Sequence, residues 1–231
     1  MKQTSSNDKR VLKMDENKII AKGILFDLDG TIFDTIPAYI EAAKITFKTI
    51  GCPLPENGKL LQIAKSIEQK ESLRDLINGD PNTFLPIYLK AFYDISTHKA
   101  KPFPNVACTL ETLSKKAKLS VITMRFVPGG AITNELKQFG LDKYFAHVVT
   151  SLDTHKPKPS PEGLIKAVTA MDVQMCDCVI IGDSTVDVMA GKAAGIKTVS
   201  VLTGLYSREE LAKVNPDFII NDISELPKLI K

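Results

Sequence analysis

The strongest constraint on this sequence is an apolar stretch at 19–26 that ends abruptly in two acids. Its β-branched and aromatic side chains predict a strand buried on both faces. Asp27 and Asp29 follow, and Gly30 and Thr31 turn the chain. A buried strand has no structural use for carboxylates at its carboxyl end, which is where ligands bind in an open α/β sheet. The alternative is a strand that runs into an acidic turn.

The remaining apolar pattern changes period twice along the chain. Residues 101–231 alternate between apolar strands, such as 119–123 and 178–181, and amphipathic helices. This alternation predicts a doubly wound, Rossmann-like parallel sheet of the α/β class. Between 35 and 100 the apolar spacing is helical, without a strand pattern. We therefore expect a discontinuous core of 19–34 and 101–231 with an all-helical insertion at 35–100.

Polar residues stand where the predicted strands end. Thr123 ends the second core strand, and Asp183 ends the fourth, with Asp187 one helical turn later. After the third strand come two lysines, Lys156 and Lys158, and the spacing alone leaves open which one enters the site. Because the carboxyl ends of parallel strands share one edge of the sheet, these side chains should converge with the first two acids.

The chemistry of these groups is mutually consistent. Asp27 can attack phosphorus, Asp29 can protonate a leaving alcohol and then activate water, and Thr123 can donate a hydrogen bond to a phosphoryl oxygen. Two carboxylates (Asp27, Asp183) and a dianionic phosphate would repel one another, and a like pair about 4 Å apart costs on the order of 4 kcal/mol. One Mg²⁺ and one lysine offset this repulsion, and oxygen ligands are those that Mg²⁺ prefers.

In their order and spacing, these residues resemble the motifs of the haloacid dehalogenase superfamily of phosphatases. The four motifs correspond to D-x-D-G-T at 27–31, Thr123, Lys156 followed by Pro-Lys-Pro, and G-D-x-x-x-D at 182–187. The resemblance covers residue 19 to the last residue and favours Lys156 over Lys158. It implies that Asp27 is the nucleophile and a Mg²⁺ ligand, that Asp29 is the acid/base and binds Mg²⁺ through its carbonyl, that Asp183 is a ligand, and that Asp187, Gly30 and Thr31 support the site.

The same resemblance implies that the insertion is a cap that closes over the site and excludes water. Related caps read the substrate near the position of Lys65 and Ser66. Met124 and Arg125 directly follow Thr123. These four residues are therefore candidate substrate contacts, and the alternative is that they are ordinary helix and loop side chains.

The leading functional prediction is a Mg²⁺-dependent phosphatase for a small phosphomonoester, similar to phosphoglycolate phosphatases. Related pyrophosphatases share all four motifs, so a diphosphate substrate stays open. β-Phosphoglucomutases are also similar, but they usually place a histidine where this chain has Tyr39. Dehalogenases lack the second acid that Asp29 supplies. A non-catalytic protein with this fold would typically have lost the nucleophile or the metal-binding acids.

Composition excludes several other classes of function. The net charge is only +3, and the densest basic run, at 115–118, has no interleaved aromatics, which argues against nucleic-acid binding. The four cysteines form no C-x-x-C pair, which argues against zinc and favours a cytoplasmic protein with reduced thiols. No apolar stretch is long enough for a membrane span. The polar segment 1–18 predicts a flexible tail rather than a signal peptide. The expected partner is a small phosphorylated metabolite, and nothing in the sequence separates a monomer from a dimer.

Overall fold

Six parallel strands form the centre of the structure, a computed structural model that describes residues 18–231. The strand order is β5-β4-β1-β6-β7-β8, so the first strand lies inside the sheet. All neighbouring pairs are parallel, which confirms the predicted doubly wound α/β class. Apart from Lys18, the predicted tail lies outside the described residues. The strands are β1 Gly23–Phe26, β4 Lys118–Ile122, β5 Phe145–Val149, β6 Cys178–Gly182, β7 Lys197–Val201 and β8 Phe218–Ile220.

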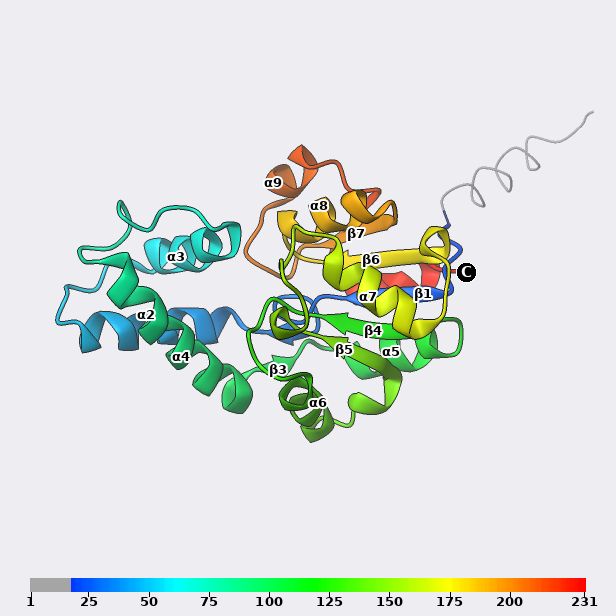
Figure 1. Ribbon diagram of the computed structural model, residues 1–231, viewed down its shortest axis with the longest axis horizontal. Coiled ribbons are helices and arrows are strands. Elements are labelled where there is room, and N and C mark those ends of the chain that lie inside the picture. The colour runs from blue at the N-terminus through cyan, green and yellow to red at the C-terminus, as the bar shows by residue number, and fades with distance from the viewer. Residues whose placement is uncertain (1–17) are drawn as a thin grey trace, which may run out of the picture.

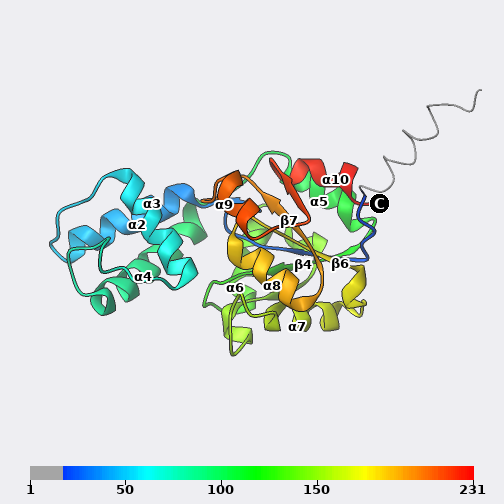
Figure 2. The same ribbon diagram turned by 90° about the horizontal axis from the view of Figure 1, so that it is seen from above.

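Successive side chains of β1 enter hydrophobic clusters on opposite faces of the sheet. Ile24 and Phe26 belong to one cluster and Leu25 to the other, as the pleat of a strand requires. Because both faces are covered, every position of β1 is apolar and buried. The helices that cover these faces are α5 Val106–Ser114 and α10 Leu226–Leu229 on one side, and α7 Glu162–Met171 and α8 Thr185–Ala194 on the other (Figure 2).

Two further helices and four short 3₁₀ turns complete the core. None of the helices described for residues 18–231 combines the length and the apolar character needed to cross a bilayer. The helices are α6 Gly129–Gln138 and α9 Arg208–Lys213, and the turns are Asp142–Tyr144, Ser151–Asp153, Met175–Asp177 and Ile223–Glu225.

Three helices between the first and second core strands form a second layer of structure beside the sheet. They are α2 Ile36–Thr49, α3 Asn57–Gln69 and α4 Pro81–Lys99, and they lie at the carboxyl ends of the strands (Figure 1). Their apolar faces enclose a hydrophobic cluster of their own, in which the rings of Phe47 and Phe84 lie 5.3 Å apart. That these helices act as a separate cap domain stays a prediction.

A short antiparallel ribbon joins these helices to the core. It consists of β2 Phe33–Asp34, on the way into the helices, and β3 Lys101–Pro102, on the way out. Phe33 pairs with Pro102 and Asp34 with Lys101. The chain therefore enters and leaves the helical insertion side by side.

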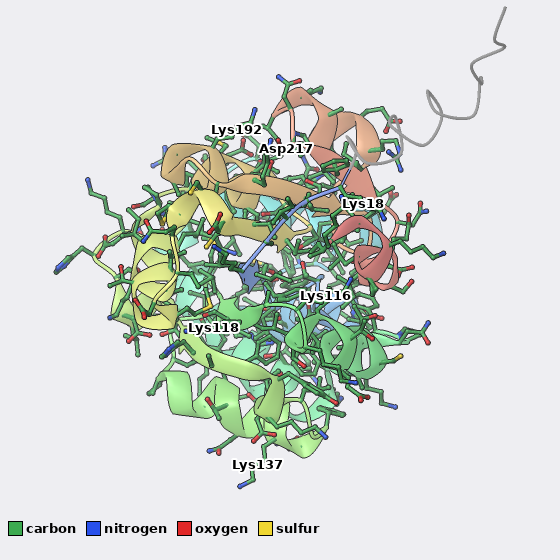
Figure 3. The ribbon with its side chains drawn as sticks, turned by 90° about the vertical axis from the view of Figure 1, so that its right-hand side faces the viewer. Lys18, Lys116, Lys118, Lys137, Lys192 and Asp217 are labelled. Atoms are coloured by element: carbon green, nitrogen blue, oxygen red, sulfur yellow. The ribbon has the colours of Figure 1, made fainter. Side chains whose placement is uncertain are left out.

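Two lysines of the basic run at 115–118 donate hydrogen bonds to the carboxyl ends of core helices. Lys116 Nζ donates to the carbonyl of Ile230 at 2.7 Å, and Lys118 Nζ donates to that of Met171 at 2.6 Å. Cations at helix carboxyl ends are favourable because the last carbonyls lack partners. Figure 3 views the face away from the helices of the insertion and shows Lys116 and Lys118 there, with Lys137 and Lys192 at a distance from them.

Candidate active site

Asp27 lies at the carboxyl end of the central strand. Its backbone N–H donates to Ile181 at 2.8 Å, which extends the ladder by one residue and fixes the direction of the side chain. The residue is 7% exposed. One carboxylate oxygen, Oδ1, accepts a hydrogen bond from Lys158 Nζ at 2.5 Å, and within residues 18–231 the other oxygen has no such partner.

Lys158, rather than Lys156, is the lysine of this site, which corrects the expected register. Lys158 is buried, and its Nζ bridges Asp27 Oδ1 and Asp187 Oδ1, each at 2.5 Å. The side chain of Lys156 is exposed, and its backbone N–H donates to Glu162 Oε2 at 3.1 Å. The Glu162 carboxylate thus holds the start of the loop at the surface, and the chain turns inward only two residues later.

Asp187 accepts a hydrogen bond from Lys158 and also caps the start of its own helix, α8. Its Oδ2 accepts from the backbone N–H and the hydroxyl of Ser184, at 3.2 and 2.8 Å, in a capping box at the start of α8. Its Oδ1 is taken by Lys158. Both oxygens therefore already have partners, so Asp187 is better placed to orient the lysine than to ligate a metal.

Asp183 follows β6, and its carboxylate fits against two glycines, Gly30 and Gly204. Gly30 has a φ of +78°, and a Cβ there would lie 2.5 Å from the Asp183 carboxylate. A Cβ on Gly204, in the loop after β7, would overlap the same carboxylate. Thr31 Oγ1 donates to Asp183 Oδ1 at 3.3 Å. The D-x-D-G-T turn and a distant glycine together make room for this acid.

The acids at this edge match the donor set of a hard divalent cation. Carboxylate oxygens of Asp27, Asp183 and Asp187 lie within 4.8 Å of one another. Burial raises the pKa of Asp27 well above its usual value, although the charge of Lys158 opposes this. Burial, together with the charge of Asp27, also raises the pKa of Asp183. One lysine thus leaves the buried carboxylates under-compensated, and oxygen donors of this kind suit Mg²⁺.

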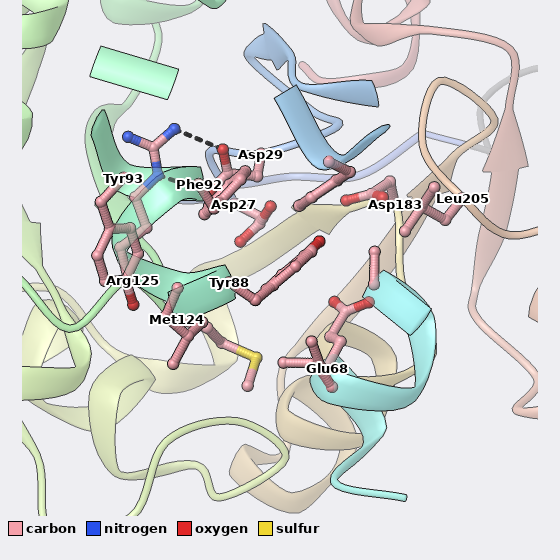
Figure 4. A pocket seen from close by; sticks show the side chains of 14 residues that line it. Asp27, Asp29, Glu68, Tyr88, Phe92, Tyr93, Met124, Arg125, Asp183 and Leu205 are labelled. Atoms are coloured by element: carbon pink, nitrogen blue, oxygen red, sulfur yellow. Dashed lines mark hydrogen bonds and ion pairs between the residues drawn. The ribbon is translucent and has the colours of Figure 1, made fainter. Parts of the chain in front are cut away.

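Asp29 points away from the other acids and is held by Arg125. Nε and Nη2 of Arg125 donate to the two oxygens of Asp29 at 2.8 and 2.6 Å (Figure 4). Nη1 donates to Glu135 Oε2 at 2.6 Å. Arg125 is 3% exposed in its side chain, so these are buried, charge-assisted bonds. The backbone N–H of Arg125 donates to Thr123 Oγ1 at 3.1 Å, which leaves the threonine proton free to donate.

A cavity of about 130 Å³ separates these acids from the helices of the insertion. Tyr39 and Phe92 stack with ring centroids 4.8 Å apart, and the Arg125 guanidinium lies 5.5 Å from the centre of the Phe92 ring. Glu68 also faces the cavity, and burial, with the charge of Asp187, raises the pKa of Glu68 to about 7. The lining residues are Asp27, Asp29, Tyr39, Ala64, Ile67, Glu68, Tyr88, Leu89, Phe92, Tyr93, Met124, Arg125, Asp183 and Leu205.

Of the four candidate substrate contacts, the structure brings two to the cavity. Met124 and Arg125 line it (Figure 4). Lys65 pairs instead with Glu210 of α9 at 2.6 Å, and Ser66 is buried 3.5 Å from Glu71. Neither Lys65 nor Ser66 lines the cavity, which favours the alternative that they are ordinary helix side chains.

Polar contacts join α3 to the core around the cavity. Besides Lys65, Glu68 Oε2 accepts from the Tyr206 hydroxyl at 3.0 Å, and Gln69 Nε2 donates to Thr185 Oγ1 at 3.4 Å. The Lys65 ammonium also lies 4.5 Å from the centre of the Tyr206 ring. The cavity is thus covered by helices that touch the core through side chains.

Several site residues were not singled out from sequence. Glu68 and Tyr88 follow the apolar spacing of helices, and Glu135 lies in an ordinary amphipathic helix. Gly204 lies in a loop that follows a strand end, as Gly30 does. Its position after a strand is the one local feature of the sequence that suggests a close approach to the acids. The other contacts depend on how the insertion folds back over the sheet.

Comparison with known proteins agrees with this geometry. A family model described as haloacid dehalogenase-like hydrolase matches residues 24–201. A protein named "Putative pyrophosphatase PpaX" from Clostridium perfringens is 32% identical over 219 residues, which cover 91% of this chain and 97% of that protein. A phosphoglycolate phosphatase from Vibrio parahaemolyticus is 27% identical, with 90% and 96% covered. A solved haloacid dehalogenase-like structure, SP0104 from Streptococcus pneumoniae, has a TM-score of 0.74 at 22% identity, with 89% and 96% covered.

Proposed function

This chain belongs to the haloacid dehalogenase-like hydrolase family, and on that premise we propose that it hydrolyses a small phosphomonoester through an aspartyl-phosphate on Asp27. The observation that carries the proposal is the environment of Asp27. One of its oxygens is held by Lys158 at 2.5 Å, and the other is open beside Asp183 at the floor of the cavity. A carboxylate fixed in this way is oriented for attack on a bound phosphoryl group.

In the first half-reaction, Asp27 forms a bond to phosphorus as the bond from phosphorus to the ester oxygen breaks. Asp29 enters this step in its protonated form and gives that proton to the leaving oxygen, for which the protonated oxygen must exchange its bond to Arg125 for one to the ester. In the second half, Asp29 takes a proton from water, which attacks phosphorus and releases phosphate and Asp27. Thr123 and Lys158 donate to phosphoryl oxygens.

We propose that the cation is Mg²⁺, held by Asp27, Asp183 and the Asp29 carbonyl. Bound there, it would offset the charge of the acids and of the phosphate. The donor set supports this choice because it contains oxygen alone.

A diphosphate substrate is the second candidate, supported by the relative from Clostridium perfringens with pyrophosphatase in its name. A mutase is less favoured, since Tyr39 offers no ring nitrogen for proton transfer and its ring stacks on Phe92. Dehalogenase activity is disfavoured by the presence of Asp29.

The test is phosphate release from a panel of small phosphomonoesters and pyrophosphate, with Mg²⁺ and with EDTA. We expect turnover that needs Mg²⁺ and that Asp27→Asn abolishes, with an unchanged circular dichroism spectrum. The exposed Asp75 provides the matched control, Asp75→Asn, which should retain full activity. Failure of every compound would refute the proposed function, and turnover by Asp27→Asn would refute the nucleophile.

A further inference from the structure

Apart from its four acids and Arg125, the cavity has a wall of apolar and aromatic side chains. Tyr39, Tyr88 and Phe92 contribute rings, and Met124 and Leu205 contribute aliphatic or thioether surface (Figure 4). Ala64, Ile67, Leu89 and Tyr93 complete the wall. A phosphoryl group bound at Asp27 would direct the rest of its ester toward this surface.

The cations near the cavity are already committed to carboxylates. Arg125 is the one cation among the lining residues, and each of its three guanidinium nitrogens donates to Asp29 or Glu135. Lys158 is bound between Asp27 and Asp187. The Lys65 ammonium lies on the outer side of α3 with Glu210. An anionic leaving group would therefore have to compete with Asp29 and Glu135 for Arg125, the one cation among the described residues that line the cavity.

The charge balance points in the same direction. Six carboxylates face or flank the cavity, against the two cations Arg125 and Lys158, so the formal charge is four negative when all are ionised. A divalent cation and a phosphate dianion together leave this balance unchanged. A further carboxylate or phosphate would add repulsion and would have to shed its hydration without a counterion. The carboxylates are Asp27, Asp29, Glu68, Glu135, Asp183 and Asp187.

One polar atom of the wall lacks a partner. The Tyr88 hydroxyl is buried, in a residue 2% exposed, and has no hydrogen-bond partner among the described residues. It points into the space between Asp27, Asp183 and Glu68 (Figure 4). Burial raises the pKa of Tyr88, so the phenol stays neutral and can both donate and accept. An unpaired buried hydroxyl is costly, and a ligand atom can satisfy it.

We propose that the leaving group of the substrate is an uncharged alcohol with an apolar or aromatic body and a neutral polar group that hydrogen-bonds to Tyr88. This inference rests on the proposed phosphatase function and names its substrate class. An apolar cavity of roughly 150 Å³ holds a benzene. The cavity here, of about 130 Å³, must also hold the phosphoryl group beside Asp27, so the leaving group can contain one ring at most. Phosphoglycolate and pyrophosphate, whose leaving groups are anionic, are then poor substrates.

The experiment compares matched phosphomonoesters by kcat/KM with Mg²⁺ present. The first pair is 2-hydroxyethyl phosphate and phosphoglycolate. The former carries a neutral hydroxymethyl group where the latter carries a carboxylate. The second is benzyl phosphate and 4-carboxybenzyl phosphate, whose leaving oxygens are nearly equal in basicity. We expect the neutral member of each pair to be favoured by at least about 30-fold, because the carboxylate would be buried unpaired.

Tyr88→Phe tests the hydroxyl while keeping the ring that stacks on Phe84. We expect kcat/KM for 2-hydroxyethyl phosphate to fall about three- to tenfold, mainly through KM, with ethyl phosphate unaffected. Met124→Lys adds a cation to the cavity wall and should raise the ratio of phosphoglycolate to 2-hydroxyethyl phosphate at least about tenfold. Met124→Leu, as its control, should leave this ratio unchanged.

The outcomes separate the two levels of the proposal. Hydrolysis of no ester would refute the phosphatase function, and this inference with it. A kcat/KM for phosphoglycolate or pyrophosphate that equals or exceeds that of the neutral esters would overturn the inference. The phosphatase function would still stand. Equal loss for ethyl and 2-hydroxyethyl phosphate in Tyr88→Phe would remove Tyr88 from the assignment.

Discussion

At the scale of single residues, burial separates two lysines that lie two positions apart in the loop after β5. Lys158 balances two buried carboxylates, while Lys156 is exposed. We expect Lys158→Met to lower kcat by about 100- to 1,000-fold, because it removes a donor from the phosphoryl site. In EDTA it should also lower the free energy of unfolding by about 3–5 kcal/mol, since Asp27 and Asp187 lose their counterion.

The matched control is Lys156→Met, which should keep kcat within about twofold of wild type, as is usual for exposed positions. Steady-state kinetics and urea unfolding of both variants measure the difference. If Lys156→Met were the inactive variant, the assignment of Lys158 would be wrong.

Gly204 tests the packing around Asp183. A Cβ at this position would overlap the Asp183 carboxylate, whereas a Cβ at Gly130 would meet nothing within 4 Å. We therefore expect Gly204→Ala to weaken Mg²⁺ activation at least about tenfold by displacing Asp183, which we propose as a ligand. Gly130→Ala should leave the Mg²⁺ dependence unchanged. Titration of activity with Mg²⁺ decides, and equal half-saturating concentrations for the two variants would contradict the packing argument.

Sequence reasoning at this scale succeeded where a strand end fixes a residue. Asp27 and Asp183 converge because β1 and β6 are neighbours and parallel. It failed for the lysine because no strand ends there, and a loop can shift by two residues without any change in the apolar pattern. Arg125 is a candidate substrate contact from its sequence position, but its three nitrogens donate to Asp29 and Glu135, and the periodicity of the sequence does not reveal such a pairing.

At the scale of elements, the contact of α3 with α9 holds the insertion against the core. Lys65 and Glu210 are 2.6 Å apart, with side chains 21% and 40% exposed. Because the pair is partly solvated, each of Lys65→Met and Glu210→Gln should raise KM only about two- to fivefold. The double variant should be no worse than either single one, as expected for a shared contact. Additive losses would show that the pair does not act as a unit.

The pH dependence of this contact follows from Glu210. The Lys65 hydrogen bond lowers the pKa of Glu210 below its usual 4.5. A lowered pKa means that the pair is complete above the unfolded value and is lost only as the pH falls through the folded one. The KM ratio of Lys65→Met to wild type should therefore be equal at pH 6 and pH 8. A ratio that changes between these two values would exclude Glu210 as the partner.

The elements themselves were largely predictable. The apolar run of β1 and the helical spacing of α2 and α4 are properties of the local sequence. Tyr88, Phe92 and Tyr93 of α4 belong to the helical pattern between 35 and 100, and in the structure they pack in the core of the insertion and also line the cavity. Periodicity shows that a face is buried, but it does not show whether the neighbour is another helix or a substrate site.

At the scale of the whole molecule, the insertion and the sheet have separate hydrophobic clusters. We expect Phe84→Ala to cost about 3–5 kcal/mol, because the ring is fully buried. Hydrogen exchange should then accelerate in α2, α3 and α4 and stay slow in β1, β4 and β6. Phe126→Ala, at a 63% exposed phenylalanine, is the control and should change neither. Equal acceleration in the strands would mean that the two parts unfold as one.

The ribbon of β2 and β3 brings the start and the end of the insertion within about 5 Å, the spacing of paired strands. A splice at Asp34 and Lys101 would leave β1, β6 and Lys158 on one continuous scaffold. We therefore expect that the three helices could be exchanged as a unit. Under the proposed function, an exchange between relatives should change which alcohol departs and keep the residues that act on phosphorus.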